Sequence, residues 1–200
     1  MKNINKIIAV QADSLNSINI CTDTTFLLCL EAQKRGFNIF WYQTSEITLS
    51  NKKVAAKGYF VKFFDRSKNF YVKKNKTELN LATSKYILIR QNPPFDMEYI
   101  NSTLYLEKLI SKVKIINNPI SIRNISEKLY SAKYKKYLPN TIFTQNLNEI
   151  KIFFKKNKKV ILKPIHSFSG NDIHLHTKFN SKFINKFIRK HDHIMCQKFL

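Results

Sequence analysis

The spacing of apolar and polar positions predicts a strand and then a helix at the start of the chain. The segment IIAVQA, residues 7–12, is almost wholly apolar and predicts a strand that is buried on both faces. After a polar loop, the segment DTTFLLCLEAQKRGF predicts a helix, with Thr22 or Asp23 as its cap and Gly36 at its end.

The first strand, this helix and the segment after it predict a strand–helix–strand unit. Phe26, Leu27 and Leu30 are expected to form its apolar stripe, and the following segment FNIFWYQ predicts a second strand. Such a unit implies a parallel sheet with a right-handed crossover. No GxGxxG motif follows the first strand, so the dinucleotide-binding fingerprint is missing from that position.

More strands follow within the first 120 residues. Residues 53–64 and 69–74 predict an antiparallel hairpin, and YILIR and KIIN predict two further sheet strands. Asp96 can cap a helix between them, with Ile100, Leu104 and Leu109 on its apolar side. Residues 1–120 are therefore expected to form one three-layer α/β domain with a parallel sheet.

The pattern changes near Pro119. Residues 121–137 predict one helix, and the rest predicts strand, helix, strand, strand, helix and strand, with Asn146 capping the first of these later helices. We expect residues 121–200 to form a linker helix and a small α+β subdomain. Its central hairpin would be joined by the loop from His166 to Asn171.

Composition narrows the class of protein. Of the 200 residues 44% are hydrophobic, which is enough for a proper core, and no apolar run approaches the roughly 18 residues of a membrane span. The three cysteines form no CxxC pair, so neither a disulfide framework nor a zinc site is implied, and a reducing cytoplasm fits best.

The net charge of +22 allows two interpretations. A strongly basic protein attracts polyanions such as nucleic acid, anionic lipid or nucleotide phosphates. The lysines are spread over the whole chain, however, beside abundant isoleucine, asparagine and phenylalanine. This composition fits the codon usage of an AT-rich genome, so we favour a solvated surface.

The segment KYILIRQNPPFD places a charge where a buried strand ends. Ligands of open α/β sheets bind beyond the carboxyl ends of the strands, and Arg90 lies at such an end. Its guanidinium can hold a carboxylate through two hydrogen bonds, while the two prolines stiffen the turn and Asn92 offers an amide. The residues alone fit equally well a solvated strand end followed by a turn.

Five collinear segments give the chain a family resemblance. They are SINICTDTTF with LEAQKRG, RQNPPFDMEYI, NNPISIRNISEKLY, ILKPIHSFSG and CQKFL. In this order and spacing the chain resembles the prokaryotic glutathione synthetases, which are ATP-grasp ligases. The resemblance implies a pre-ATP-grasp domain followed by the first part of an ATP-grasp domain. It also implies ligation of γ-glutamylcysteine with glycine through an acyl phosphate, with ATP and Mg²⁺ as cofactors.

The resemblance assigns roles to individual residues. Asp23, Thr24, Arg90 and Asn92 would bind the dipeptide, and Arg90 and Lys163 would be the catalytic residues. The nucleotide would be held by a second set of residues: Lys128, Lys163, Ser169, Gly170, Gln197 and Leu200.

The chain departs from the family pattern in two places. The phosphate loop HSFSGND keeps only Gly170 where the family is glycine-rich, and Asp172 adds a negative charge near the expected phosphates. The family also continues past the position of Leu200 with its metal ligands. We therefore expect no metal ligand in these residues and no turnover by a 200-residue chain acting alone.

Other functions remain open at this stage. A non-catalytic, decayed binding domain or a basic nucleic-acid-binding protein are the alternatives, although the chain has no recognition-helix or RNP-like motif. His174 and His176 could share a strand face, but a solvated polar face is the simpler interpretation. We expect small-molecule partners, no nucleic acid and no membrane, and a homo-oligomer is possible.

Overall fold

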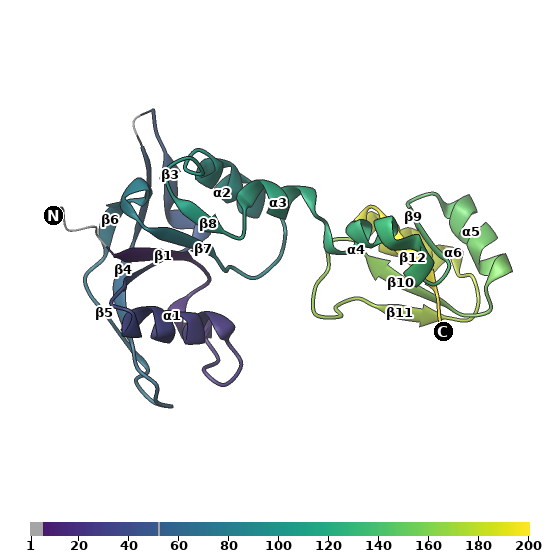
Figure 1. The fold of residues 1–200 in the computed structure, drawn as a ribbon. Coiled ribbons are helices and arrows are strands. Elements are labelled where there is room, and N and C mark those ends of the chain that lie inside the picture. Colours follow the sequence, from purple (N-terminus) through teal and green to yellow (C-terminus); the bar gives the residue numbers. More distant parts are fainter. Residues whose placement is uncertain (1–5, 52) are drawn as a thin grey trace. The chain divides into compact units, whose positions relative to one another are not determined.

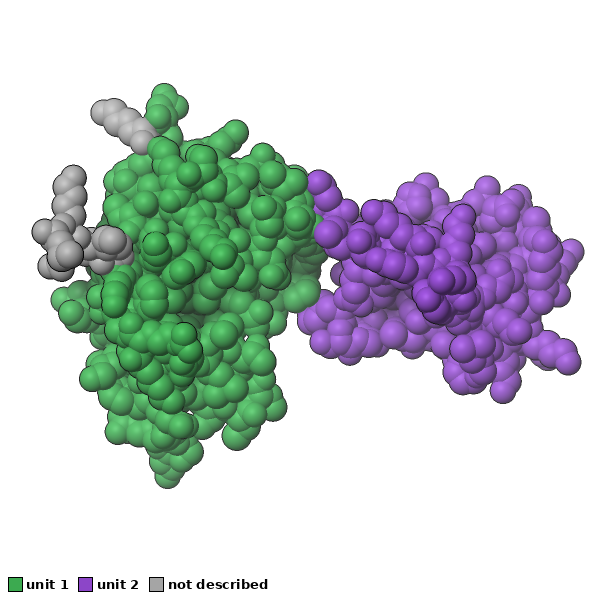
Figure 2. All heavy atoms as spheres, in the orientation of Figure 1, with its two compact units in different colours: residues 1–123 green, residues 124–200 purple. Residues whose placement is uncertain are grey.

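The computed structural model describes residues 6–51 and 53–200. Two compact units, residues 1–123 and 124–200, divide the chain (Figure 2). Each unit has its own sheet and its own buried core, and each is described separately.

Four parallel strands form the centre of the first unit. They are β1 (Ile7–Gln11), β2 (Asn38–Tyr42), β7 (Tyr86–Ile89) and β8 (Lys114–Ile116), in the order β2-β1-β7-β8. The pairings β1–β2, β1–β7 and β7–β8 are all parallel, as the strand–helix–strand pattern predicts.

Antiparallel strands extend this parallel centre. The long strand β4 (Val54–Phe63) pairs with β2 and with three short strands, β3 (Ile47–Leu49), β5 (Tyr71–Lys73) and β6 (Thr77–Asn80). The predicted hairpin of β4 and β5 is confirmed. The sheet is thus mixed, and β3 and β6 were not predicted, since each is too short to show an alternating pattern.

Helices cover both faces of the sheet (Figure 1). Alternate residues of β1 enter two separate cores, with Ala9 in one and Val10 in the other. α1 (Thr24–Lys34) packs Phe26 into the second core, and α2 (Met97–Glu107) packs Leu106 into the first. The predicted three-layer arrangement is confirmed.

The predicted inner faces of both helices need correction. Leu27 is 57% exposed and Leu104 is 42% exposed, so neither is a core position. In α1 the buried set is Thr25, Phe26, Cys29 and Ala32, and in α2 it is Ser102, Thr103 and Leu106. Small and polar residues occupy inner positions of both helices, so a prediction from hydrophobicity alone assigned Leu27 and Leu104 to the wrong face.

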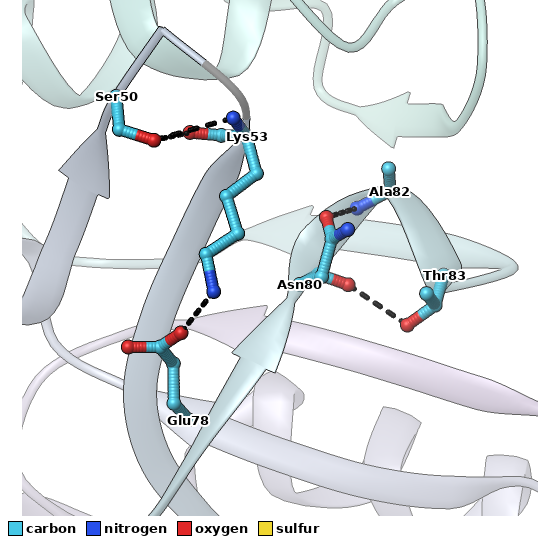
Figure 3. Close-up of polar contacts among 6 residues, drawn as sticks. All are labelled: Ser50, Lys53, Glu78, Asn80, Ala82 and Thr83. Atoms are coloured by element: carbon cyan, nitrogen blue, oxygen red, sulfur yellow. Dashed lines mark hydrogen bonds and ion pairs between the residues drawn. The ribbon is translucent and has the colours of Figure 1, made fainter.

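Polar contacts close the edge of the sheet near β3 and β6 (Figure 3). Lys53 forms an ion pair with Glu78, and its backbone N–H donates to Ser50 Oγ at 3.3 Å. Asn80 ends β6 by accepting the Ala82 N–H at 3.1 Å. Charged side chains of this kind protect an edge strand from further pairing.

The second unit is a four-stranded antiparallel sheet with two helices on one face. Its strand order is β11-β10-β12-β9, and the predicted succession of strands and helices is confirmed. The elements are β9 (Thr141–Thr144), α5 (Leu147–Lys156), β10 (Val160–Pro164), β11 (His174–His176), α6 (Ser181–His191) and β12 (Ile194–Lys198). The predicted cap is also present, because Asn146 Oδ1 accepts the N–H groups of Asn148 and Glu149.

The prediction of one helix over residues 121–137 is wrong. The structure has α3 (Pro119–Asn124), α4 (Glu127–Tyr130) and a 3₁₀ segment, Ser131–Tyr137. Ser126 is extended, with φ −69° and ψ 125°, and Tyr134 is non-helical, with φ −110° and ψ 44°. Serine is less favourable inside a helix than at its start, and Ser126 lies at the start of α4, although its side chain makes no capping hydrogen bond there.

Short 3₁₀ turns complete the secondary structure. Among the described residues of the first unit, three such turns lie at Leu15–Ser17, Thr44–Glu46 and Leu81–Thr83. Across residues 6–51 and 53–200, none of the helices has the length and apolar character needed to cross a membrane.

Gly58 in β4 is required by a close backbone approach. A Cβ there would lie 2.9 Å from the Phe40 ring and 3.0 Å from Tyr42 Cβ, and it would also collide with the Trp41 carbonyl oxygen. We expect Gly58→Ala to destabilise the first unit by about 1–3 kcal/mol. The measurement is amide hydrogen exchange, which should accelerate in β2 and β4.

Gly170→Ala is the control for this substitution. It adds the same methyl group in the second unit, where no heavy atom lies within 4 Å and the φ of 74° confines any strain to that unit's loop. Exchange in β2 and β4 should stay at the wild-type rate in this variant. Unchanged exchange in Gly58→Ala would contradict the account.

Candidate functional site

Two strand ends create a polar edge in the first unit. β1 and β7 run parallel and end side by side, and the Arg90 N–H donates to the Gln11 carbonyl oxygen at 2.7 Å. The residues that follow each strand therefore meet at one edge of the sheet, where open α/β folds bind their ligands.

Arg90 is braced by the start of α1. Its Nε donates to Thr25 Oγ1 at 3.0 Å, and one terminal nitrogen donates to Thr24 Oγ1 at 2.7 Å. Asp23 caps the same helix, because its Oδ1 accepts the N–H groups of Thr25 and Phe26. No described residue accepts a hydrogen bond from the second terminal nitrogen, which leaves these donors for a ligand.

Asp13 is held beside Arg90 at the same edge. Its Oδ2 accepts hydrogen bonds from the backbone N–H of Asn92 at 3.1 Å and from the Asn92 side chain at 2.8 Å. The indole N–H of Trp41 donates to the Asp13 carbonyl oxygen at 2.8 Å. These side chains line one cavity of about 300 Å³, which we call the strand-end pocket.

All four residues predicted to bind the dipeptide line the strand-end pocket. They are Asp23, Thr24, Arg90 and Asn92. Asp13 and Thr25 line it as well and were not predicted. Asp13 directly follows the first predicted strand, so its position at a strand end was a signal available in the sequence.

A buried polar network lies next to the pocket. Gln11 is fully buried, and its side-chain amide donates to Gln91 Oε1 and to Ser102 Oγ, each at 3.1 Å. These bonds join the ends of β1 and β7 to α2. Buried hydrogen bonds of this kind fix geometry, because breaking one leaves an unpaired polar group.

The charged residues of the pocket contribute to the pKa shifts of two neighbouring side chains, Tyr99 and Cys29. Burial raises the pKa of Tyr99, with Arg90 lowering it and Asp13 raising it. Burial also raises the pKa of the Cys29 thiol to about 12, and Asp23 adds to the rise. Cys29 is therefore a neutral core residue at physiological pH and not a nucleophile.

The second unit has its own cavity on the face of its sheet opposite the core. Along β10 the side chains alternate, with Val160 and Leu162 in the core and Lys163 on the opposite face. Lys163 Nζ donates to Gln197 Oε1 at 2.9 Å, and Gln197 Nε2 donates to Thr141 Oγ1 at 3.0 Å. This chain of bonds holds the lysine across three strands.

Lys128 reaches the same cavity from α4. Its Nζ donates to the Ser167 carbonyl oxygen at 2.5 Å, which ties the helix to the loop between β10 and β11. Ser169 and Gly170 in this loop have φ values of 51° and 74°. The cavity measures about 320 Å³, and five of the six predicted nucleotide-binding residues line it: Lys128, Lys163, Ser169, Gly170 and Gln197.

Leu200 and Asp172 lie elsewhere. Leu200, the sixth predicted nucleotide-binding residue, is 87% exposed and does not line the cavity. The Asp172 carboxylate accepts a hydrogen bond from Lys190 at 2.6 Å and lies 3.1 Å from His191 Nε2. The hydrogen bond from Lys190 is the main cause that lowers the pKa of Asp172. The expected negative charge near the phosphates is thus paired with α6 instead.

The histidines of β11 pack against phenylalanines. The His176 ring lies 4.6 Å from Phe183, and the His174 ring lies 5.1 Å from the same side chain, measured between centroids. Among residues 6–51 and 53–200, no three His, Cys, Asp or Glu side chains are grouped as a metal site requires. We assign these histidines to packing.

Because His176 is partly buried against Phe183, we expect its pKa to be lowered. Burial lowers the pKa of His176 from 6.5, and the neighbouring His174 lowers it further. The unfolded chain therefore takes up this proton more readily, so the second unit should lose stability as pH falls below about 6.5. An NMR titration should place the His176 pKa below 6.5. Phe183→Ala should raise it, and a pKa at or above 6.5 in the wild type would contradict the assignment.

Comparisons with known proteins agree with this fold. Among solved structures, D-cycloserine synthetase DcsG superposes with a TM-score of 0.62 at 11% identity, covering 97% of this chain and 59% of that one. An ATP-grasp RimK domain protein from Sphaerobacter thermophilus gives 0.59 at 14% identity, covering 97% and 64%. At such identities the likeness shows the fold, which is that of the ATP-grasp proteins.

Sequence comparison gives the family. The prokaryotic glutathione synthetase N-terminal domain matches residues 7–123, and the ATP-grasp domain of the same family matches residues 127–200. The chain therefore belongs to the prokaryotic glutathione synthetase family.

Curated relatives support this assignment. The glutathione synthetase of Mesorhizobium japonicum is 35% identical over 84% of this chain and 54% of its own length. That of Vibrio parahaemolyticus is 34% identical over 83% and 53%. The chain thus spans about half the length of the curated relatives that it matches.

Proposed function

We propose that this chain carries the dipeptide-binding domain and part of the nucleotide-binding domain of a glutathione synthetase. The reaction is the ATP-dependent ligation of γ-glutamylcysteine with glycine, which yields glutathione, ADP and phosphate. The observation that carries the proposal is Arg90, which lines the strand-end pocket at the end of β7 and is held there by Thr24 and Thr25. A fixed guanidinium of this kind suits a substrate carboxylate.

The second cavity has the charge that a nucleotide requires. Lys128 and Lys163 both line it, and each is held by a hydrogen bond to a neighbouring loop or strand. Two ammonium groups offset the charge of neighbouring phosphates, and the left-handed backbone at Ser169 and Gly170 turns the loop over the same cavity. ATP, when bound, supplies the phosphoryl group that activates the carboxylate of the dipeptide.

The residues of this chain then have distinct tasks. Arg90 would orient the dipeptide, and Lys163 would neutralise phosphate charge as it shifts during transfer. The loop from Ser167 to Gly170 would exclude water from the reacting carboxylate. Mg²⁺ is the cofactor that the family implies, and Glu127 is the one carboxylate among the described residues that line the cavity.

The same proposal implies the partners and the cellular location of the protein. We propose small-molecule substrates and a location in the cytoplasm, where the three cysteines would stay reduced. A homo-oligomer is compatible with the proposal. A non-catalytic relative of the ligases is the alternative, and it differs in lacking turnover while keeping the same binding sites.

Arg90→Met tests the dipeptide site. Losing a charge-assisted hydrogen bond should weaken γ-glutamylcysteine binding by about tenfold or more, measured by calorimetry. Arg90→Lys should recover only part of the affinity, because an ammonium lacks the planar fork. Lys68→Met, which removes an exposed charge in the β4–β5 turn, is the control. Equal affinities for all four proteins would contradict the proposed site.

Lys163→Met tests the nucleotide site. We expect ATP affinity to fall by about tenfold or more, since the lysine is held on the cavity face of β10. Lys151→Met, on the exposed side of α5, keeps the total charge equal and should bind as the wild type does. Loss of affinity in both variants alike would indicate binding by net charge instead of by this cavity.

A further inference from the structure

The strand-end pocket combines one guanidinium with carboxylates. Arg90, Asp13 and Asp23 all line the same cavity of about 300 Å³. A site that bound only an anion would gain nothing from carboxylates, because they repel the ligand. This combination instead suits a ligand head that carries a positive and a negative charge close together.

Asp13 is arranged in advance for a cationic partner. Both hydrogen bonds from Asn92 go to Oδ2, and no described residue donates to Oδ1. The Trp41 indole, itself 3% exposed, fixes the backbone of Asp13 through its carbonyl oxygen. An acceptor oxygen on a rigid support is therefore presented to the cavity without a large entropy cost on binding.

Asp23 has a different task. Its Oδ1 accepts both N–H groups at the start of α1, so its charge is offset by the positive end of that helix. Asp13 lies after a strand, and among the described residues only Asn92 donates hydrogen bonds to its carboxylate. Asp13 is for this reason the better acceptor for an ammonium group.

We propose that Asp13 determines specificity by binding the α-ammonium group of the γ-glutamyl end, while Arg90 binds the α-carboxylate on the same carbon. This inference rests on the proposed function and adds which end of the dipeptide enters the strand-end pocket. A cavity of this size lies near the lower limit for ligand sites, which suits an amino-acid head. The cysteinyl end, whose carboxylate reacts, then remains outside the pocket.

The proposal makes a prediction about linkage. In a γ-linked dipeptide the ammonium and the free carboxylate share one carbon. In α-glutamylcysteine that carboxylate is consumed by the peptide bond, so the paired charges are lost although composition and net charge are the same. The pocket should therefore select the γ-linked isomer.

The experiment is calorimetric titration of the 200-residue chain with three ligands. They are γ-glutamylcysteine, α-glutamylcysteine and glutarylcysteine, which lacks only the α-ammonium group. We expect the wild type to bind the first about tenfold more tightly than either analogue, because each analogue loses a charge-assisted hydrogen bond.

Asp13→Asn separates a binding role from a structural one. It should weaken γ-glutamylcysteine by about tenfold. Glutarylcysteine has no ammonium to lose, so it should bind Asp13→Asn at least as tightly as the wild type, because a carboxylate that repels its anionic head has been removed. Asp65→Asn, at an exposed position of the β4–β5 turn, removes the same charge outside the pocket and should match the wild type.

Each of the remaining outcomes of these titrations would contradict one part of the proposal. Equal weakening of both ligands in Asp13→Asn would make Asp13 structural, and loss of selectivity in Asp23→Asn instead would move the role to Asp23. A wild type that binds glutarylcysteine as tightly as γ-glutamylcysteine would refute the proposal and leave the proposed function standing. No binding of any ligand would refute the proposed function itself.

Discussion

The parallel pairing of β1 with β7 is the constraint on which the first unit depends. It joins Gln11 to Arg90 through a backbone hydrogen bond and brings two strand ends to one edge. The polar residues that follow each strand then meet the start of α1, where Thr24 and Thr25 brace the guanidinium. A shift in this register would separate Arg90 from its supports, so the sheet and the site are specified by the same pairing.

In the second unit, the alternation of side chains along each strand positions the residues of the site. One face of its sheet is closed by α5 and α6 over a core that contains Leu162 and Cys196. The opposite face carries Lys163 and Gln197, which bond to one another across β10 and β12. Because side chains alternate along each strand, the residues between the core positions lie on the face opposite the core. The loop beside the cavity on that face contains two residues with left-handed backbone, Ser169 and Gly170.

The strong local signals of the sequence predicted most of the elements. The apolar run of β1, the Asp23 and Asn146 caps, and the lysine after the β10 run were all readable, because each depends on near neighbours. Within the first unit, what failed depends on tertiary contacts. β3 and β6 exist through pairing with β4, and the inner face of α1 is set by close packing that leaves Leu27 exposed. The role of Asp13 needed the position of Asn92, which lies 79 residues away along the chain.

The most direct test of the account is a crystal structure of the 200-residue chain with γ-glutamylcysteine bound. The account predicts the dipeptide at the carboxyl ends of β1 and β7, with its glutamyl α-carboxylate on Arg90 and its α-ammonium group on Asp13. A dipeptide bound away from this edge, or bound there with its cysteinyl end on Arg90, would contradict it.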